Sequence, residues 1–469
     1  MRFRAFLGGC ACVAALALCV PADAAAREPI PPRPLDMRAA VERALRHNPG
    51  LGAQEAQSRA SEEGRKAARG AFGPKLGMTY GVTKRESRPA SAQRPAEYGV
   101  YRWGVEVSQP VFRGFQLLAA YQKAALQADS DRAAVRQAEL RMTEKVQTVF
   151  LNYLRAEEDC LSEKEALERL RDQLRITRAS YEAGLRPRLD VLQAEVDVSE
   201  AESAVIQAEN ARETRLAELN TLLGLPATAR TSYAGALRPV PFRLSLEQCL
   251  ERAFRQRPDL EMAAKSVAIA GMSQKEAQSA YYPQIEAYYN VTQEGNTPDL
   301  RRAGNHGSRS STWEVGARAT WDVFQWGTTW YADQQAGWIV TRMRREEEDL
   351  KLSVGYDIKS KLLAVREAEK RMGVARMGVT RAKEAYAVAA ARYRERVGTN
   401  FEVLDASSKL RTARASLTGA RADYLTALAQ MYAAMGEFHP DVRASGDARP
   451  ARGIPSRNFL PARPAGERP

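Results

Sequence analysis

The chain has 469 residues, a formal net charge of +13 and three histidines, with 44% hydrophobic and 27% charged residues. Beyond the N-terminus, no stretch reaches the roughly 18 apolar residues that a membrane-spanning helix needs, which argues against an α-helical membrane protein. Arginine is dispersed rather than clustered with aromatic residues, so the positive charge does not indicate a nucleic-acid partner.

Residues 1–26 have the pattern of a secretory signal peptide. Arg2 and Arg4 precede an apolar run that extends to Val20 and is followed by small residues. Cleavage after Ala24 or after Ala26 fits the A-x-A rule, and the apolar run is too short for a spanning helix. We therefore expect an exported protein.

Two of the five cysteines, Cys160 and Cys249, lie beyond this signal. Both occur in helical patterns far apart in the sequence. We interpret them as small buried hydrophobic residues in preference to a disulfide pair.

The remainder of the chain is an internal duplication. The segment LDMRAAVERALRHNPGL at 35–51 aligns without gaps to LSLEQCLERAFRQRPDL at 244–260, so that Pro49 corresponds to Pro258, 209 positions later. From Phe112 onwards the separation becomes 212, which places a three-residue insertion in an intervening loop. A fixed register of this kind indicates two copies of one structural unit.

This register predicts the organisation of the chain. We expect a signal peptide at 1–26, a Pro-rich segment at 27–34, repeats at 35–224 and 244–436, a linker at 225–243, and a disordered Pro/Arg-rich tail at 437–469.

Each repeat contains two segments with the period of two that is typical of a strand. The expected strands are at about 75–84, 102–112, 284–293 and 313–324, each with one apolar face and one polar face. An isolated hairpin of this kind would fit a soluble protein. Two such hairpins in an exported, duplicated chain favour a transmembrane β-barrel.

Four strands cannot close a barrel, and an open sheet edge in lipid leaves backbone groups without hydrogen bonds. Several copies of the chain must therefore share one barrel. A dimer would give eight strands and a trimer would give twelve, and the strand pattern leaves both open.

A long helix without proline follows each hairpin, at about 115–183 and 327–395. Its length is roughly 100 Å at 1.5 Å per residue. Return helices are expected at 188–223 and 400–435. Each repeat also has an opening helix, at about 36–72 in the first repeat and at the equivalent place in the second, which supplies the remaining length. Two half-length helices can then lie end to end along each long helix.

These elements resemble the TolC-like outer-membrane channels over residues 35–436. The most specific segments are SQPVFRG (108–114), TWDVFQWG (320–327), SYEAGLRPRLDVLQAE (180–195) and RYRERVGTNFEVLDAS (392–407). The resemblance implies a mainly α fold with a transmembrane β-barrel, built as a homotrimer with a 12-stranded barrel and an α-helical barrel. It implies a passive exit channel in the outer membrane, extending into the periplasm.

The same resemblance implies partners and a gate. The partners would be a periplasmic adaptor protein, an inner-membrane pump of the RND or ABC type and outer-membrane lipid, in an efflux pump or a type I secretion system. No cofactor is implied. The periplasmic gate would contain Glu402, Asp405, Asp190 and Tyr393, and three-fold symmetry would turn each carboxylate into a ring that attracts cations. Glu402 and Asp405 would also suit the first turn of a helix for electrostatic reasons alone.

The tip turns would dock the adaptor through Gly184, Leu185, Gly398 and Thr399. The sequence departs from the family pattern at two places, because Gln193 stands at the first-repeat equivalent of Asp405 and Arg396 at the second-repeat equivalent of Gly184.

Catalysis has no support among the motifs, because phosphate-loop, zinc-protease and serine-hydrolase signatures are all missing from the sequence. The competing interpretation is a periplasmic adaptor or coiled-coil scaffold, which would also be exported and helical but would not need lipid-compatible strands.

Overall fold

The computed structural model describes residues 34–87, 96–295, 309–395 and 397–438. The predicted signal peptide, all but one residue of the Pro-rich segment, most of the predicted tail and Arg396 lie outside the described residues. The helices and strands of the first repeat are α1 Met37–His47, α2 Pro49–Gly70, β1 Lys75–Ser87, β2 Ala96–Arg113, α3 Gln116–Glu182 and α4 Arg188–Leu222. Those of the second repeat are α5 Leu246–Gln256, α6 Pro258–Gln278, the short η1 Ser279–Tyr281, β3 Gln284–Gly295, β4 Arg309–Thr320, α7 Thr328–Arg394 and α8 Asn400–Ala434.

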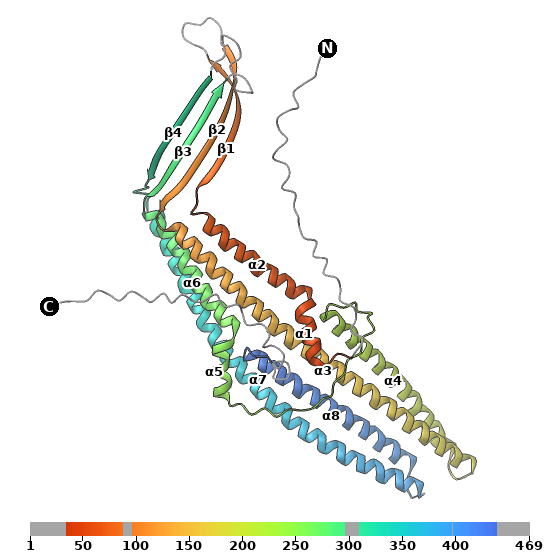
Figure 1. Ribbon diagram of the computed structural model, residues 1–469. Helices are drawn as coiled ribbons and strands as arrows, with labels where there is room; N and C mark the ends of the chain where they lie inside the picture. Colours follow the sequence, from red (N-terminus) through yellow and green to blue (C-terminus); the bar gives the residue numbers. More distant parts are fainter. Residues whose placement is uncertain (1–33, 88–95, 296–308, 396, 439–469) are drawn as a thin grey trace, which may run out of the picture.

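The two long helices, α3 and α7, run the length of an elongated helical body (Figure 1). The upper half of α3 packs against α2 and its lower half against α4, and α7 packs in the same way against α6 and α8. The predicted arrangement, in which two half-length helices lie end to end along a long one, is confirmed. Among the described helices, none has an apolar stretch sufficient to span a bilayer.

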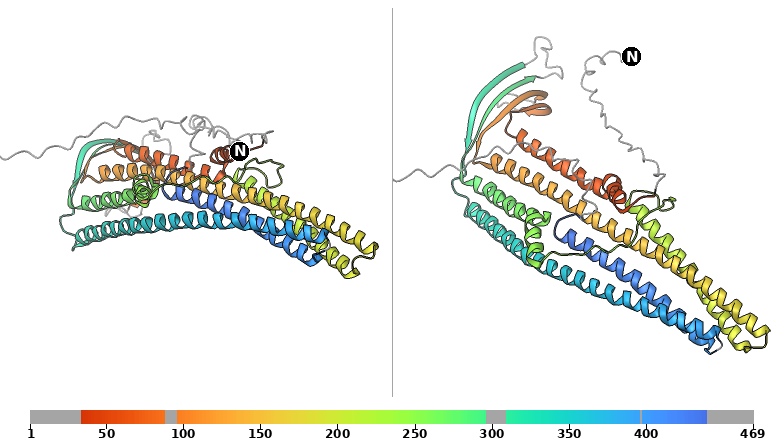
Figure 2. Two further views of the ribbon diagram at one scale, coloured as in Figure 1. Left: turned by 90° about the horizontal axis from the view of Figure 1, so that it is seen from below. Right: turned by 60° about the horizontal axis from the view of Figure 1, so that its bottom comes forward.

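The opening helix of each repeat was predicted as continuous, and this prediction is wrong. It is broken in the first repeat at Asn48 and in the second at Arg257, the residues that precede Pro49 and Pro258. A proline ring clashes with an α-helical residue before it and favours an extended conformation there. Asn48 accordingly has ψ 121° and Arg257 has ψ 120°. The short helices α1 and α5 therefore diverge from α2 and α6 (Figure 2).

The four strands form one antiparallel sheet in the order β1-β2-β3-β4 at one end of the body (Figure 1). The central pair β2 and β3 joins the hairpins of the two repeats, for example at Val105 opposite Val291. Strand β2 is longer than predicted. Strand β4 begins and ends about four residues earlier than predicted, because its partner β3 begins at Gln284, opposite Thr320.

One face of this sheet is apolar and exposed. In register across the strands, Leu76 lies beside Val107, and Met78 beside Val105. Leu76 is 71% exposed and Trp313 is 70% exposed. The opposite face carries polar residues such as Glu106, Asn290 and Glu314 in one row. Large apolar side chains do not gather on an exposed face without a lipid or protein neighbour to cover them.

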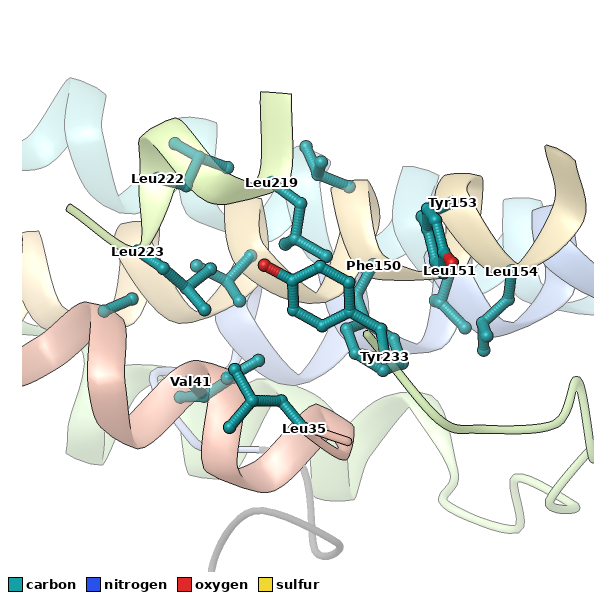
Figure 3. Packing of buried hydrophobic residues seen from close by; sticks show 14 of the residues in the cluster. Leu35, Val41, Phe150, Leu151, Tyr153, Leu154, Leu219, Leu222, Leu223 and Tyr233 are labelled. Atoms are coloured by element: carbon teal, nitrogen blue, oxygen red, sulfur yellow. The ribbon is translucent and has the colours of Figure 1, made fainter. Parts of the chain in front are cut away.

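The first apolar core lies at mid-height, where α1, α3 and the end of α4 meet the linker between the repeats (Figure 3). Tyr233 of the linker packs edge-on against Phe150 and Tyr153, and its hydroxyl donates to Asn220 Oδ1 at 2.7 Å. Leu35 extends beside Tyr233 as an isolated parallel bridge. The linker is therefore part of the core rather than a loose connection.

The second core occupies the equivalent place in the second repeat, around α5, α7 and α8. Cys249 is completely buried in it. Cys160 is buried on α3, and both thiols are free, so the predicted small hydrophobic role is confirmed and the disulfide alternative is wrong.

Candidate functional site at the helical tips

The far end of the body, away from the sheet, consists of the α3–α4 and α7–α8 tips (Figure 1). The first tip turns at Gly184, which has φ 70° and donates its backbone N–H to Tyr181 at 2.8 Å. A left-handed residue in this position is the common C-terminal end of a helix, and glycine adopts it without steric cost. Leu185 follows and is 52% exposed.

The second tip is built differently. Gly398 is buried, and a Cβ on it would lie 3.1 Å from the Cβ of Arg392 and 3.2 Å from a carboxylate oxygen of Glu402. Close packing rather than a left-handed backbone therefore favours glycine there. Thr399 caps α8, because its hydroxyl accepts from the backbone N–H of Glu402 at 3.3 Å.

The two tips are joined to each other by a tip cluster of Gln173, Thr177, Arg186, Tyr393 and Asn400. The hydroxyls of Thr177 and Tyr393 lie 3.2 Å apart. Arg186 lies over the Tyr393 ring at 4.8 Å and donates to the Gly398 carbonyl at 3.1 Å. Tyr393 and Thr177 are both buried, so this contact is shielded from water.

Asn400 completes the tip cluster from the start of α8. Its amide oxygen accepts from Gln173 at 2.8 Å, and its amide nitrogen donates to the backbone carbonyl of Asp190 at 3.4 Å. Asn400 is 2% exposed, and a buried amide is costly unless it is hydrogen-bonded. The cluster therefore favours the two tips remaining together.

The predicted gate carboxylates lie around this cluster. Glu402 is in the first turn of α8 and forms a 3.5 Å ion pair with Arg392. Asp405 pairs with Lys409 at 2.7 Å, and Asp190 is in the first turn of α4. The structure thus places all three acids at the tips, at the starts of the two return helices. The electrostatic preference for acids near a helix start applies to Asp190 and Glu402.

Sequence reasoning identified Tyr393 but missed the rest of the tip cluster. Gln173 contacts Asn400, and Thr177 contacts Tyr393, only because two tips more than 200 residues apart lie side by side. The one local signal was the presence of polar residues at positions that the helical packing buries. Gln193 and Asp405, which occupy equivalent positions in the two repeats, line the same groove of about 570 Å³ between α4 and α8.

Above the tips, α3 and α8 contact each other through polar side chains. We call this contact the within-chain seam. Its ion pairs and hydrogen bonds are Arg155–Asp423 (3.8 Å), Thr418–Glu158 (3.3 Å), Arg411–Glu163 (3.6 Å) and Arg414–Glu165 (2.8 Å), followed by the tip cluster. At the level of Arg155 and Asp423, Leu154 and Ala422 belong to the first apolar core.

Within the described ranges, no group of three or more His, Cys, Asp or Glu side chains could hold a metal ion. The polar residues at the tips are joined in pairs across helices. Their arrangement can hold helices together or let them separate, and it presents carboxylates around the tips.

The profile of the family described as outer membrane efflux protein matches residues 40–225 and 249–437. The chain belongs to the outer membrane efflux protein family. Members of this family are outer-membrane channels that extend into the periplasm, and the predicted resemblance and location are confirmed. Each matched range covers all but the first five residues of one predicted repeat.

Individual relatives support the same family assignment. The outer membrane protein TolC of Vibrio cholerae is 25% identical over 378 residues, covering 78% of this chain and 83% of TolC. The alkaline protease secretion protein AprF of Pseudomonas aeruginosa is 22% identical over 318 residues, covering 66% of this chain and 64% of AprF. The chain thus matches less than two thirds of AprF. The CmeC outer membrane channel of Campylobacter jejuni has a TM-score of 0.75 at 16% identity, with 85% of both chains covered, which shows a common fold.

Proposed function

We propose that this efflux family member is a homotrimeric exit channel, a passive conduit that carries substrate from an inner-membrane transporter across the periplasm and the outer membrane. The observation that carries the proposal is the four-stranded sheet, which has an exposed apolar face and two edges, β1 and β4, that have no partner strand among the described residues. Lipid suits the apolar face, and copies of the same chain suit the edges.

Three copies give twelve strands, and the polar face with Glu106, Asn290 and Glu314 then surrounds the lumen. The helical bodies continue this barrel into the periplasm as a tunnel. No observation favours the alternative of a soluble adaptor, since a coiled-coil scaffold has no use for an exposed apolar sheet face.

The tips form the periplasmic gate in this proposal. The tip cluster with Tyr393 keeps the entrance narrow, and Glu402, Asp405 and Asp190 place carboxylates around it. Acids close to a narrow entrance attract cations and repel anions. Tyr393 acts here as a buried contact between helices, which follows from its 5% exposure.

An adaptor protein docks at the tip turns and links the channel to an RND or ABC pump. Of the four residues predicted for docking, Leu185 is the exposed apolar one, whereas Gly398 is buried. Leu185 therefore supplies adaptor contact area, and Gly184, Gly398 and Thr399 set the shapes of the turns. The name of AprF, a protease secretion protein, supports secretion as one use of such a channel.

The test is membrane fractionation followed by recording in planar lipid bilayers. We expect the protein in the outer-membrane fraction, as a detergent-extracted oligomer that dissociates on heating, with cation-selective conductance. Recovery as a soluble periplasmic protein without conductance would overturn the proposal.

A further inference from the structure

The linker between the repeats, residues 225–243, is rich in positive charge. It contains Arg230, Arg238 and Arg243, and the chain has no acidic residue between Glu218 and Glu247. All three arginines are exposed. Within the part of the chain that the structure describes, their guanidinium groups form no ion pair and no hydrogen bond. We call these three residues the arginine belt, and its charge is available to an anionic partner.

The apolar cores hold the arginine belt in place. Each arginine directly follows a residue that packs inward: Ala229 is 8% exposed, Leu237 is 4% exposed, and Phe242 packs against the second core. The hydroxyl of Tyr424 also donates to the Val240 carbonyl at 2.6 Å. The backbone beside each arginine is therefore already ordered, which lowers the entropic cost of binding a partner.

The three arginines are spread across the helical body rather than gathered at one point. Ala229, beside Arg230, accepts a hydrogen bond of 2.9 Å at its carbonyl oxygen from Asn220 near the end of α4. Phe242, beside Arg243, packs edge-on against a tyrosine of α8. Between these points the linker crosses from one repeat to the other (Figure 1). A small anion would contact one arginine at a time, whereas an extended polyanion can contact all three.

The height of the linker excludes membrane lipid as the partner. The linker lies beside α1, because Leu35 and Tyr233 form a parallel bridge. Helix α2, with 22 residues, extends from there towards the sheet and spans roughly 33 Å, and α6, its counterpart above α5, has 21 residues. Lipid headgroups at the rim of the sheet are therefore beyond the reach of an arginine side chain.

In the proposed channel the linker lies on the outer side of the tunnel. Three copies of α1, the linker and α5 on the inner side would obstruct the conduit. The arginine belt of each copy therefore faces the surrounding periplasm, and three arginines in each of three copies give nine around the circumference.

The composition of the linker favours a polymer over a folded protein as the partner. A protein interface usually has an apolar centre, and Val240, 45% exposed, is the one large hydrophobic side chain that the described linker exposes. Arginine binds carboxylates through two parallel hydrogen bonds. Peptidoglycan, the polymer that surrounds any structure crossing the periplasm, carries free carboxylates on its stem peptides.

On the basis of the proposed trimeric channel, we propose that the arginine belt binds the stem-peptide carboxylates of peptidoglycan and so holds the channel in the cell wall. Each exposed ion pair contributes little by itself, because water competes for both groups. The arginines of all copies in one oligomer bind the polymer simultaneously, which combines weak contacts into a stable attachment. Attachment of this kind weakens as salt is added.

The first experiment sediments the detergent-extracted oligomer with purified peptidoglycan sacculi and measures the share of protein in the pellet. Wild type is compared with R230Q/R238Q/R243Q and with R230K/R238K/R243K. We expect wild type to sediment at low salt and to be released at high salt. The glutamine variant should lose binding several-fold, and the lysine variant, which retains the charge, should keep most of it. Unchanged sedimentation of the glutamine variant would overturn the inference.

The matched control is R59Q/R175Q/R345Q, which removes the same charge from arginines on α2, α3 and α7 whose side chains are at least 76% exposed. It should sediment like wild type. Equal losses in the two glutamine variants would show attraction by net charge alone and would also overturn the inference. The oligomeric state and the single-channel conductance of both variants should match those of wild type, so that lost binding does not reflect misfolding.

The second experiment needs no variant. Wild-type protein is sedimented with sacculi whose carboxylates have been converted to amides. We expect the protein to stay in solution, because the groups that the arginines bind have lost their charge. Sedimentation equal to that with native sacculi would contradict carboxylate recognition. Failure of the channel proposal itself would appear differently, as the absence of an oligomer and of conductance in wild type.

Discussion

Asn48 donates a hydrogen bond of 2.9 Å from its side-chain amide to the carbonyl oxygen of Leu222, and so joins the start of the first repeat to its end. Its amide oxygen also accepts from the backbone N–H groups of Gly50 and Leu51 at the start of α2. In the second repeat, Arg257 donates to the equivalent carbonyl of Ala434 at 3.0 Å. Different side chains thus join the start of the repeat to its end in the two repeats.

The substitution Asn48→Ala removes both functions of this side chain. We expect a loss of about 1–2 kcal/mol, the usual contribution of a helix N-cap, together with faster amide exchange at the end of α4. Asn48→Asp keeps the cap and loses only the donor to Leu222. It should therefore retain protection at the start of α2, and equal effects of the two substitutions on α2 would contradict this assignment.

Gly224 packs directly on the break between α1 and α2. It has φ 72°, and a Cβ would lie 2.6 Å from the backbone oxygen of His47. We expect Gly224→Ala to destabilise the protein by at least about 2 kcal/mol, because alanine disfavours this backbone and clashes with the neighbouring chain.

Gly271 provides the matched control for this substitution. It lies within α6 and has no atom within 4 Å of an added Cβ. Gly271→Ala should stabilise by up to about 1 kcal/mol, since alanine is the better helix former. The thermal midpoint of unfolding of the detergent-extracted protein checks both substitutions. Similar midpoints for Gly224→Ala and Gly271→Ala would contradict the conclusion that close packing requires glycine at position 224.

The ion pairs of Arg257 predict that part of the stability of the protein depends on pH. It is 16% exposed and pairs with Asp259 at 2.7 Å and Asp357 at 3.0 Å. Burial alone would raise the pKa of Asp259, but the hydrogen bond and charge of Arg257 outweigh burial and hold this pKa below its ordinary value. A carboxyl group whose pKa is lower in the folded state than in the unfolded state stabilises the folded protein. This contribution is present in full above the ordinary pKa of about 3.9, and it is lost as the pH falls through the folded-state pKa.

We therefore expect Arg257→Ala to cost about 2 kcal/mol at pH 7, from the lost charged hydrogen bonds. The difference in thermal midpoint between wild type and variant should decrease below about pH 4. A difference that does not depend on pH would show that Asp259 is not the titrating partner.

The gate proposal predicts a change in ion selectivity. Replacement of Glu402 and Asp405 together by alanine should lower the ratio of cation to anion permeability measured as a reversal potential in a salt gradient, because two carboxylates per chain are lost near the entrance. Glu348→Ala on α7 is the control for loss of an acid elsewhere. Unchanged selectivity in the double variant would remove both acids from the gate.

Much of this architecture could be predicted because the repeat register carries it. The long helices α3 and α7 and the return helices α4 and α8 follow from uninterrupted helical patterns between Gly and Pro signals. The alternation of Leu76, Met78 and Tyr80 located β1. The break at Asn48 was accessible in principle, because Pro49 follows it, but an amphipathic pattern that continues on both sides concealed the change of direction.

The tip cluster could not be predicted in the same way. Thr177 and Tyr393 are 216 positions apart, and each is unremarkable within its own helix. Their contact depends on how the two coiled pairs lie against each other, which no local pattern encodes.

The pairing of β2 with β3 has a consequence for biogenesis. Trp103 lies opposite Gln293, so the sheet requires strands almost 200 residues apart, one from each repeat. Contacts between such distant segments form slowly, and the first hairpin cannot complete a sheet until the second repeat has been exported. During that interval the apolar face around Leu76 is exposed to the periplasm, where unpaired strands aggregate readily. Any shielding of the exposed hairpins during this interval therefore favours assembly over aggregation.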